Sequence, residues 1–280
     1  MIDTKLQQQL HEKYNPEGSV LRHAQLRMTE MLVFLDKVCT KYHLRYWLDS
    51  GTLLGACRHG GFIPWDDDTD VCMPIEDLRK LRKIFATEHL SDEFILQTPD
   101  NDKNYLRIEW CVLRDLKSEY VQDGYRFHRG LKYKGLQIDV FPMERGIHPF
   151  LMKIANHYQW RFTNQCVLND RIPYKMGMKF AKIFRKLETT FLIPVFRIFD
   201  KKTSDFYSYS YGCGFLYKHS VKSTFPLKKI PFEGNQLSVP NDTDTYLKEI
   251  YGDWEKLPSE EEIHTHNVVI RFYDKPVNTI

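Results

Sequence analysis

Residues 45–74 read RYWLDSGTLLGACRHGGFIPWDDDTDVCMP, a series of short apolar runs around a group of carboxylates. Apolar runs that break at turn residues are typical of short buried strands, and the residues after such a break can begin a helix. The predicted order is a strand over 45–48, a turn over 49–51, a helix over 52–58, a glycine-bearing loop over 59–65, the acidic run 66–70 and a buried strand over 71–73.

Helices and strands alternate on both sides of this stretch. Before it, apolar residues recur at spacings of three and four over 19–42, which predicts an amphipathic helix with Ser19 as its N-cap. After it, we expect a helix over 75–88, followed by strands over 94–97, 106–113 and 136–141 and a hairpin over 230–237. This alternation favours a mixed α/β or α+β sheet domain.

The composition excludes several classes of protein. The 280 residues are 42% hydrophobic and 28% charged, which is typical of a globular chain and excludes wholesale disorder. Forty Lys and Arg against 37 Asp and Glu leave a net charge of +3, too near balance to indicate a nucleic-acid partner. We find no apolar signal region, no run that could span a bilayer and no CxxC cysteine pair. We therefore expect a cytoplasmic protein with free thiols, which could act at the inner face of the membrane.

The acidic run 66–70 places four carboxylates next to an apolar strand. This arrangement costs free energy unless a cation or bound protons offset the like charges. Alternate strand residues share a face, so Asp68 and Asp70 should point one way and Thr69 the other. Two carboxylates on one face suit Mg²⁺ or Mn²⁺, because Mg²⁺ is held by a few carboxylates together with substrate phosphates and water. The alternative interpretation is a solvated acidic loop.

Two further features extend this candidate site. Ser50, Gly51 and Thr52 leave a strand and open a helix, so their N–H and hydroxyl groups could hold phosphate oxygens, or they could form an ordinary turn. Asp139 is a lone acid in an apolar strand, which needs a partner: a shared metal or a buried salt bridge. Strand, Ser-Gly turn, helix, loop and Asp-x-Asp strand is the order used at metal-dependent nucleotidyltransferase sites.

The stretch also closely resembles the signature of the LicD family, the bacterial phosphorylcholine transferases, which are similar to the fukutin-related proteins. The unbroken run from Tyr46 to Asp70 carries most of the resemblance, and it continues through 73–78 and through Ile138-Asp139-Val140-Phe141-Pro142-Met143. A C-terminal block adds Val239-Pro240, Tyr246 to Trp254, Leu257-Pro258, His264 and His266. The resemblance as a whole extends over roughly residues 19–145 and 230–270.

The resemblance implies an α+β fold, with a nucleotidyltransferase-like mixed β-sheet core flanked by helices and a helical basic insertion. It implies transfer of phosphocholine or a similar phospho-alcohol from CDP-choline or another CDP-linked donor. The acceptor would be a hydroxyl of a glycan or lipid-linked glycan, for decoration of cell-surface polysaccharide or lipopolysaccharide. Carried onto this chain, Asp68, Asp70 and Asp139 become metal ligands and catalytic residues, and the turn over 50–52 lines the donor phosphates.

Other residues are candidates for contact with substrate because of their own chemistry. Arg58 and His59 are candidates for a phosphate or leaving group, because Arg grips phosphate with two parallel hydrogen bonds. Asp139 could orient or deprotonate the acceptor hydroxyl, with Asp66, His264 and His266 as other candidate bases. A quaternary ammonium is held by ring faces. The aromatic candidates for that role are Trp65, Trp110, Tyr207, Tyr209 and Tyr211, although an ordinary strand face explains the three tyrosines better.

We divide the chain into a catalytic core over 19–145, a helical basic segment of unknown role over 146–229 and a C-terminal block over 230–280 that packs on the core. A rival interpretation is a nucleotidyltransferase that modifies a small molecule and releases pyrophosphate rather than CMP. Another is an inactive relative that binds glycan or membrane.

The basic segment has its own pattern. Residues 151–202 hold eleven Lys and Arg and three Asp and Glu. One side of a predicted helix would carry Lys175, Lys179, Lys182, Arg185 and Lys186, and the other Phe180, Ile183, Phe184 and Leu187. Such a helix could lie on an anionic membrane surface, or it could pack on the core and leave its basic side in solvent.

Overall fold

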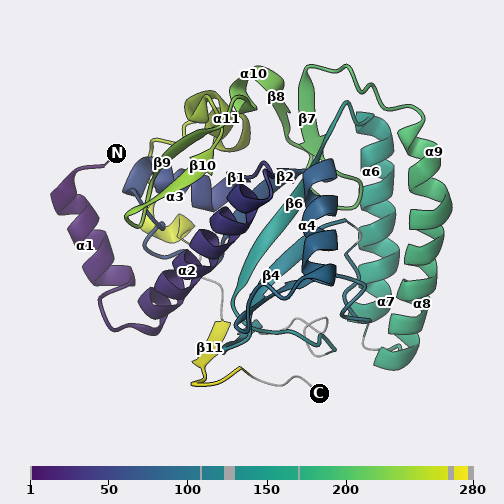
Figure 1. Ribbon diagram of the computed structural model, residues 1–280, viewed down its shortest axis with the longest axis horizontal. Coiled ribbons are helices and arrows are strands. Elements are labelled where there is room, and N and C mark those ends of the chain that lie inside the picture. The colour runs from purple at the N-terminus through teal and green to yellow at the C-terminus, as the bar shows by residue number, and fades with distance from the viewer. Residues whose placement is uncertain (1, 108, 123–129, 170, 264–267, 277–280) are drawn as a thin grey trace.

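A mixed sheet of seven strands forms the centre of the protein in the computed structural model, which describes all residues except 1, 108, 123–129, 170, 264–267 and 277–280 (Figure 1). Its strands run in the order β1-β2-β6-β4-β3, and β7 pairs with β6 and in turn with β8. Strands β2 and β6 are parallel, whereas the other neighbours are antiparallel. The strands are β1 (Trp47–Leu48), β2 (Asp70–Pro74), β3 (Phe94–Gln97), β4 (Cys111–Asp115), β6 (Gln137–Arg145), β7 (Phe206–Tyr209) and β8 (Lys218–Ser220). The structure therefore confirms the predicted mixed sheet flanked by helices.

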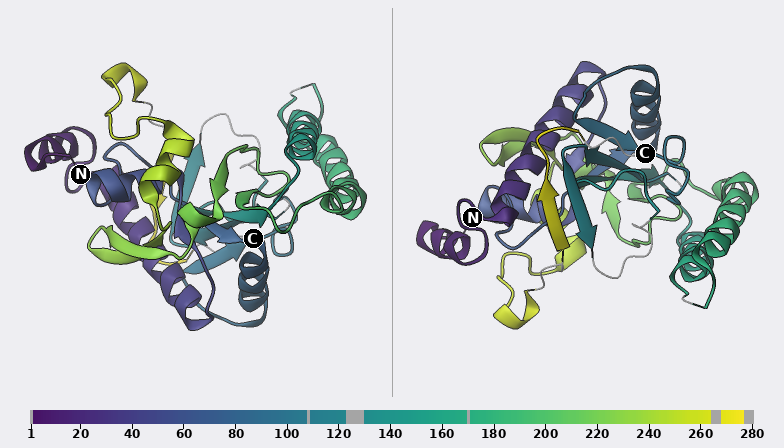
Figure 2. Two further views of the ribbon diagram at one scale, coloured as in Figure 1. Left: turned by 90° about the horizontal axis from the view of Figure 1, so that it is seen from above. Right: turned by 90° about the horizontal axis from the view of Figure 1, so that it is seen from below.

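Helices surround the sheet, and α6, α7, α8 and α9 gather at one end of the molecule (Figures 1 and 2). Two antiparallel ribbons accompany them, β9 (Lys228–Phe232) with β10 (Asn235–Val239) and β5 (Ser118–Gln122) with β11 (Val268–Phe272). The helices are α1 (Thr4–Tyr14), α2 (Val20–Lys41), α3 (Ser50–His59), α4 (Ile75–Thr87), α6 (Pro149–Tyr158), α7 (Gln165–Leu168), α8 (Tyr174–Leu187), α9 (Ile193–Arg197), α10 (Val221–Thr224) and α11 (Thr243–Tyr251).

Helix α2 follows the predicted pattern. The Ser19 side chain accepts a hydrogen bond from the Arg22 N–H at 3.1 Å and caps the helix. Ala24, Met28 and Met31 are fully buried among the apolar residues of the sheet, as their spacing predicts. The helix therefore covers the sheet with one apolar face, and its other side remains polar.

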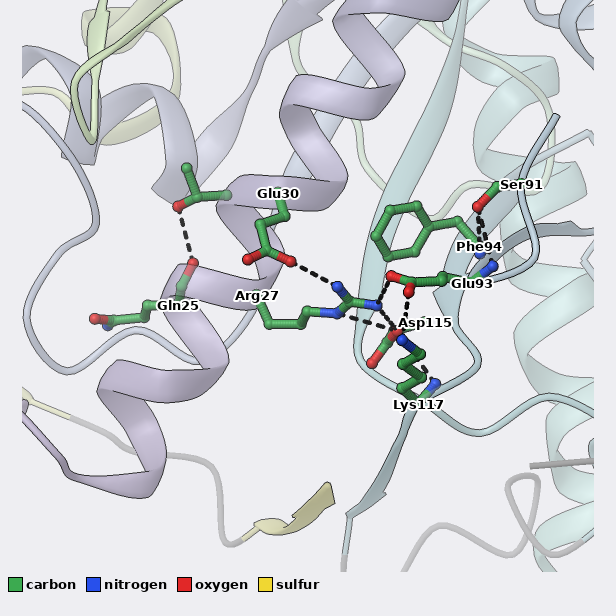
Figure 3. A network of polar contacts seen from close by, with 9 residues as sticks. Gln25, Arg27, Glu30, Ser91, Glu93, Phe94, Asp115 and Lys117 are labelled. Atoms are coloured by element: carbon green, nitrogen blue, oxygen red, sulfur yellow. Dashed lines mark hydrogen bonds and ion pairs between the residues drawn. The ribbon is translucent and has the colours of Figure 1, made fainter. Parts of the chain in front are cut away.

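A network of ion pairs fastens the polar side of α2 to the sheet (Figure 3). The Arg27 guanidinium donates to Asp115 Oδ1 at 2.8 Å, to Glu93 Oε2 at 2.9 Å and to Glu30 Oε2 at 2.6 Å. Lys117 adds a second cation against Glu93. Because Asp115 is buried at the end of β4, this network ties the helix to the strand, and each of its carboxylates has a cationic partner.

The structure corrects several expected elements. The strand predicted over 106–113 begins only at Cys111, because the chain before it forms a loop in which the Tyr105 hydroxyl donates to the Trp110 carbonyl at 2.9 Å. Strand β2 includes Pro74, whereas the strand was expected to end before this proline. Helix α1 and the β5–β11 ribbon were not predicted.

Other expectations are confirmed. All six cysteines are free. In the part of the chain that the structure describes, no helix is long and apolar enough to cross a membrane.

Candidate active site

The Asp-x-Asp segment and Asp139 lie on two adjacent parallel strands. In the β2–β6 ladder, Asp70 is the register partner of Asp139, and the Asp139 N–H donates to the Thr69 carbonyl at 2.8 Å. The Asp70 N–H donates to Thr52 Oγ1 at 2.9 Å, so the first turn of α3 is tied to the start of β2. The fold thus brings together carboxylates that are about seventy residues apart in sequence.

The acidic run alternates in direction as predicted. Asp66, Asp68 and Asp70 line a pocket of about 780 Å³. Asp67 is buried on the other side, where the Tyr120 hydroxyl approaches its Oδ2 at 3.4 Å, and Thr69 Oγ1 approaches Met28 Sδ at 3.3 Å. Half-buried like charges therefore concentrate on one wall of the pocket, and the intervening side chains pack inward.

The start of helix α3 forms the adjoining wall. Ser50 and Gly51 line the pocket, and Ser50 has a φ of 46°, a left-handed conformation that is uncommon for a residue with a side chain. A Cβ on Gly51 would lie 2.8 Å from Asp66 Oδ2, so only glycine lets the Asp66 carboxylate approach the helix this closely. The first turn of α3 thus presents its N–H groups at the edge of the acidic wall. Thr52 is buried and acts through its bond to Asp70 rather than by lining the pocket.

Asp49 holds this turn in place, and sequence reasoning missed it. Its buried carboxylate accepts hydrogen bonds from Ser50 Oγ at 3.0 Å, from the Tyr246 hydroxyl at 2.8 Å and from the Tyr209 hydroxyl. Trp47 Nε1 donates to the Tyr246 hydroxyl at 3.0 Å. An acid directly after the apolar run 46–48 was the available signal, because a buried carboxylate requires donors.

A group of aromatic side chains lines the same pocket as the carboxylates. It comes from Trp65 and from two segments far along the chain: Phe215 and Tyr217 before β8, and Tyr251 and Trp254 at and after the end of α11. Sequence reasoning named only Trp65 among these five. Residues 246–254 belong to the C-terminal block of the resemblance, but no motif or spacing within them indicates that they reach the acidic strand.

Crowding and burial make the carboxylates hard to ionise. Burial, followed by the charges of Asp68, Asp139, Asp49 and Asp66, raises the pKa of Asp70 well above its usual value. Burial and the charge of Asp68 likewise raise the pKa of Asp66. The site therefore concentrates negative charge to a degree that a bound cation or protons would relieve.

Asp139 differs from the other acids because donors hold both its oxygens. Trp110 Nε1 donates to Oδ1 at 2.9 Å and Gln137 Nε2 to Oδ2 at 3.1 Å. Burial raises the pKa of Asp139 to about 6, although Arg114 and Arg107 act in the opposite direction. The Arg107 guanidinium lies 4.0 Å from the centroid of the Trp110 ring, so an arginine occupies one face of the ring proposed for choline.

Arg58 and His59 are engaged within the protein. Arg58 lines the pocket, but its Nη1 donates to the carbonyls of Trp254 at 3.1 Å and Lys256 at 3.2 Å. His59 Nε2 accepts from Arg58 Nε at 3.0 Å, and its Nδ1 lies 2.6 Å from Gln7 Oε1. Burial and the Arg58 charge lower the pKa of His59 to about 3, so this ring is neutral. Arg58 thus holds the aromatic segment against α3.

The remaining candidates are structural or lie outside the described residues. Tyr207 and Tyr209 are buried on β7, as an ordinary strand face predicts, whereas Tyr211 is buried in the turn that follows the strand. His264 and His266 lie outside the residues that the structure describes.

The site was also assessed as a holder of a divalent cation. Among the described residues, no three acidic, thiol or imidazole side chains are arranged as a ready-made metal cage. Asp68 and Asp70 fit Mg²⁺ nonetheless, because this ion is commonly bound by one or two carboxylates and takes its other ligands from substrate phosphates and water. The raised pKa of Asp70 agrees with this, since it reflects like charges that a cation would offset.

Comparison with known proteins finds similarity over much of the chain. Residues 43–169 match the family model described as LicD/FKTN/FKRP, nucleotidyltransferase domain. The chain is 26% identical over 268 residues to the lipopolysaccharide cholinephosphotransferase LicD of Haemophilus influenzae, covering 89% of this chain and 96% of that protein. It is 31% identical over 134 residues to an uncharacterized protein of Rickettsia prowazekii, covering 41% of this chain and 49% of that protein. It is 47% identical over 45 residues to the human ribitol 5-phosphate transferase FKRP, covering 16% of this chain and 9% of that protein.

Proposed function

The chain belongs to the LicD/FKTN/FKRP family of transferases, and from this premise we propose that it transfers phosphocholine or a similar phospho-alcohol from a CDP-linked donor to a glycan hydroxyl. The observation that carries the proposal is the pocket itself. Carboxylates and aromatic rings line the same pocket, which suits a donor whose pyrophosphate joins a nucleoside to an alcohol.

Asp68 and Asp70, with Asp139 on the adjacent strand, would hold Mg²⁺ or Mn²⁺. An ion held there would supply charge neutralisation for the donor pyrophosphate. The N–H groups at the start of α3, beside Ser50 and Gly51, face the same end of the pocket and can donate to phosphate oxygens. Phosphoryl transfer depends on this kind of positioning and charge stabilisation more than on covalent chemistry by the protein.

We assign Asp139, the register partner of Asp70 on the adjacent strand, as the group that receives the proton. The acceptor hydroxyl attacks the phosphorus that bears the alcohol, the bond from that phosphorus to the oxygen of CMP breaks, and the hydroxyl proton passes to the carboxylate. The donors Trp110 Nε1 and Gln137 Nε2 fix the orientation of this carboxylate. A pKa of about 6 leaves it ionised at neutral pH and able to accept the proton.

The aromatic side chains of the pocket argue for a donor with a cationic alcohol such as choline. A quaternary ammonium cannot donate a hydrogen bond and is held by the faces of aromatic rings. Trp65, Tyr251 and Trp254 line the pocket and offer such faces. The relative from H. influenzae is named as a cholinephosphotransferase and the human one as a ribitol 5-phosphate transferase, so both donors belong in the test.

The test is incubation with Mg²⁺ and CDP-choline, CDP-ribitol or CDP-glycerol, with released CMP measured by chromatography. We expect CMP release to depend on Mg²⁺, to exceed the blank most with CDP-choline, and to be absent in Asp70→Asn. Pyrophosphate released from a nucleoside triphosphate in place of CMP would indicate nucleotide transfer to a small molecule. Donor binding without turnover of any of them would indicate an inactive relative.

A further inference from the structure

Helix α8 and the turns that follow it expose a continuous apolar stripe. Met176, Phe180, Ile183 and Leu187 recur every three or four residues along α8, and each is between 45% and 52% exposed. The stripe continues through the wider turn Glu188–Leu192 and α9 with Phe191, Val195, Ile198 and Phe199, all exposed. Monomeric proteins rarely leave a patch of this extent to water without a binding role.

The opposite side of α8 provides its packing. Gly177, Met178 and Ala181 are buried there, and a Cβ on Gly177 would lie 2.1 Å from the Cys166 carbonyl, so the neighbouring helix approaches closely. The side of α8 that packs against the neighbouring helix thus consists largely of small residues, and the large apolar side chains of α8 face outward. Phe184 packs between α8 and the helical turns of residues 159–164, where its ring stacks against Phe162 with 5.1 Å between the ring centroids.

A row of lysines borders the stripe. Lys175, Lys179, Lys182 and Lys186 follow the same spacing on an adjacent side of α8, and all four are exposed. Arg185, expected in this row, instead donates to the Tyr105 carbonyl at 3.2 Å. Beyond the row lies a hollow of about 340 Å³ whose lining includes Lys182, Lys186, Arg82, Lys103 and Arg185.

In the described part of the chain no ion pair engages the four lysines of the row, whereas Arg82 at the hollow is paired with Asp100 at 2.9 Å. Of the three carboxylates in 151–202, Glu188 is buried, Asp200 accepts from the Tyr211 hydroxyl at 2.7 Å, and Asp170 lies outside the described residues. The segment therefore presents a strongly basic surface next to its apolar stripe.

We propose that this surface, made of the apolar stripe and the lysine row, is a peripheral docking site for an anionic lipid bilayer. Apolar side chains on one side and lysines on its border are the combination that lets a helix lie in a membrane interface, with the stripe at the acyl boundary and the ammonium groups at the phosphates. A second copy of the chain fits less well, because an apolar stripe laid against its own copy would leave the lysine row without an anionic partner. The proposal stands independently of the proposed activity.

The test is flotation of the intact protein with vesicles of phosphatidylcholine alone or mixed with phosphatidylglycerol, at low and high ionic strength. We expect binding to the mixed vesicles at low ionic strength, weaker binding in salt and negligible binding to phosphatidylcholine. Changing Lys175, Lys179, Lys182 and Lys186 to Gln should lower the partition coefficient by roughly 100-fold or more, at about 1 kcal/mol for each basic residue. Phe180→Ser with Phe191→Ser should weaken binding and make what remains fully salt-sensitive.

Two matched sets control for general effects. Lys37, Lys41, Lys83 and Lys222 are exposed lysines outside the segment, and their change to Gln should leave binding near the wild-type level. Val20→Ser with Leu26→Ser removes exposed apolar side chains from α2 in the same way. Failure of the folded wild-type protein to float with the mixed vesicles at low ionic strength overturns the proposal. Equal losses in the test and control sets, or a stable dimer that the stripe variants dissociate without any vesicle binding, overturn it too.

Discussion

The protein contains two groups of carboxylates whose surroundings are opposite in kind. Around Asp115 and Glu93, each carboxylate has a cation as its direct partner: Arg27 donates to both, and Lys117 to Glu93 (Figure 3). Around Asp70, the largest influences after burial are other carboxylates. The first arrangement lowers the pKa of Glu93, chiefly through Lys117, whereas the second raises the pKa of Asp70 well above its usual value.

The difference separates a structural role from a functional one. A compensated group stabilises the fold without further ligands, and removing one partner leaves a buried charge alone. A group of like charges opposes folding in the absence of a ligand and is therefore a candidate site for binding a cation. Substitutions in the two groups should accordingly have opposite consequences for activity and stability.

The largest expected effect is on turnover. Asp70→Asn, and separately Asp68→Asn, should lower CMP release by roughly 10³-fold or more, the scale lost when a charge-stabilising group is removed from a reaction site. Because each change removes one of several like charges, the melting temperature without metal should hold or rise. Turnover and differential scanning fluorimetry measure the two effects. The exposed Asp92→Asn serves as control, and wild-type turnover in either site variant would contradict the assignment.

The structural group should show the reverse behaviour. Arg27→Met leaves the buried Asp115 carboxylate without its main partner, so we expect a loss of about 3 kcal/mol in the free energy of unfolding. CMP release per folded molecule should stay near the wild-type value. Arg271→Met is the matched control, since it removes a mostly exposed arginine paired with Glu119 and should cost less than about 1 kcal/mol in urea titrations. Equal destabilisation by both changes would refute the contrast.

Much of the fold was predictable because its signals are local. The spacing of Ala24, Met28 and Met31 determines the buried face of α2, and Ser19 caps it as expected. The loop before Cys111 was mistaken for strand because apolar residues there pack without pairing, and periodicity alone cannot distinguish the two. The alternation that places Asp68 and Asp70 together also follows from local geometry.

The aromatic side chains that line the pocket could not be predicted from the sequence, and the reason is physical. Tyr251 and Trp254 reach the pocket only through the packing of α11 and the bonds from Arg58 to the carbonyls of Trp254 and Lys256. These contacts span nearly two hundred residues and leave no periodic trace in the sequence. The contact of Trp110 is likewise not visible in the sequence, because its indole N–H donates to Asp139 on a neighbouring strand.

A smaller effect concerns pH and metal. The pKa of Asp139 is raised to about 6 in the folded protein, above the ordinary value of about 3.9, and those of Asp66 and Asp70 are raised too. The native state therefore binds more protons than the unfolded state, and metal-free stability should fall by on the order of 1–2 kcal/mol as pH rises from about 4 through about 6. Since Mg²⁺ competes with protons, it should raise the melting temperature more at neutral than at acid pH. Asp68→Asn with Asp70→Asn should abolish that metal effect, and an equal effect of Mg²⁺ on the double variant would contradict it.

The smallest expected effect concerns the hydrogen bond from Trp110 that adjusts the pKa of Asp139. The Trp110 indole N–H donates to Asp139 and lowers the pKa of that carboxyl against the effect of burial. Trp110→Phe keeps an aromatic ring but removes the donor, so the pKa of Asp139 should rise and the carboxylate should lose part of its orientation. The acid limb of the pH profile of kcat/KM should then move upward by less than about one pH unit, and kcat at neutral pH should fall by roughly 10-fold. Phe141→Leu is the control, because it removes the ring packed 4.6 Å from Trp110 without touching the hydrogen bond, and it should lower kcat without moving the limb. A limb that moves equally in both variants would assign the shift to packing and not to the indole N–H.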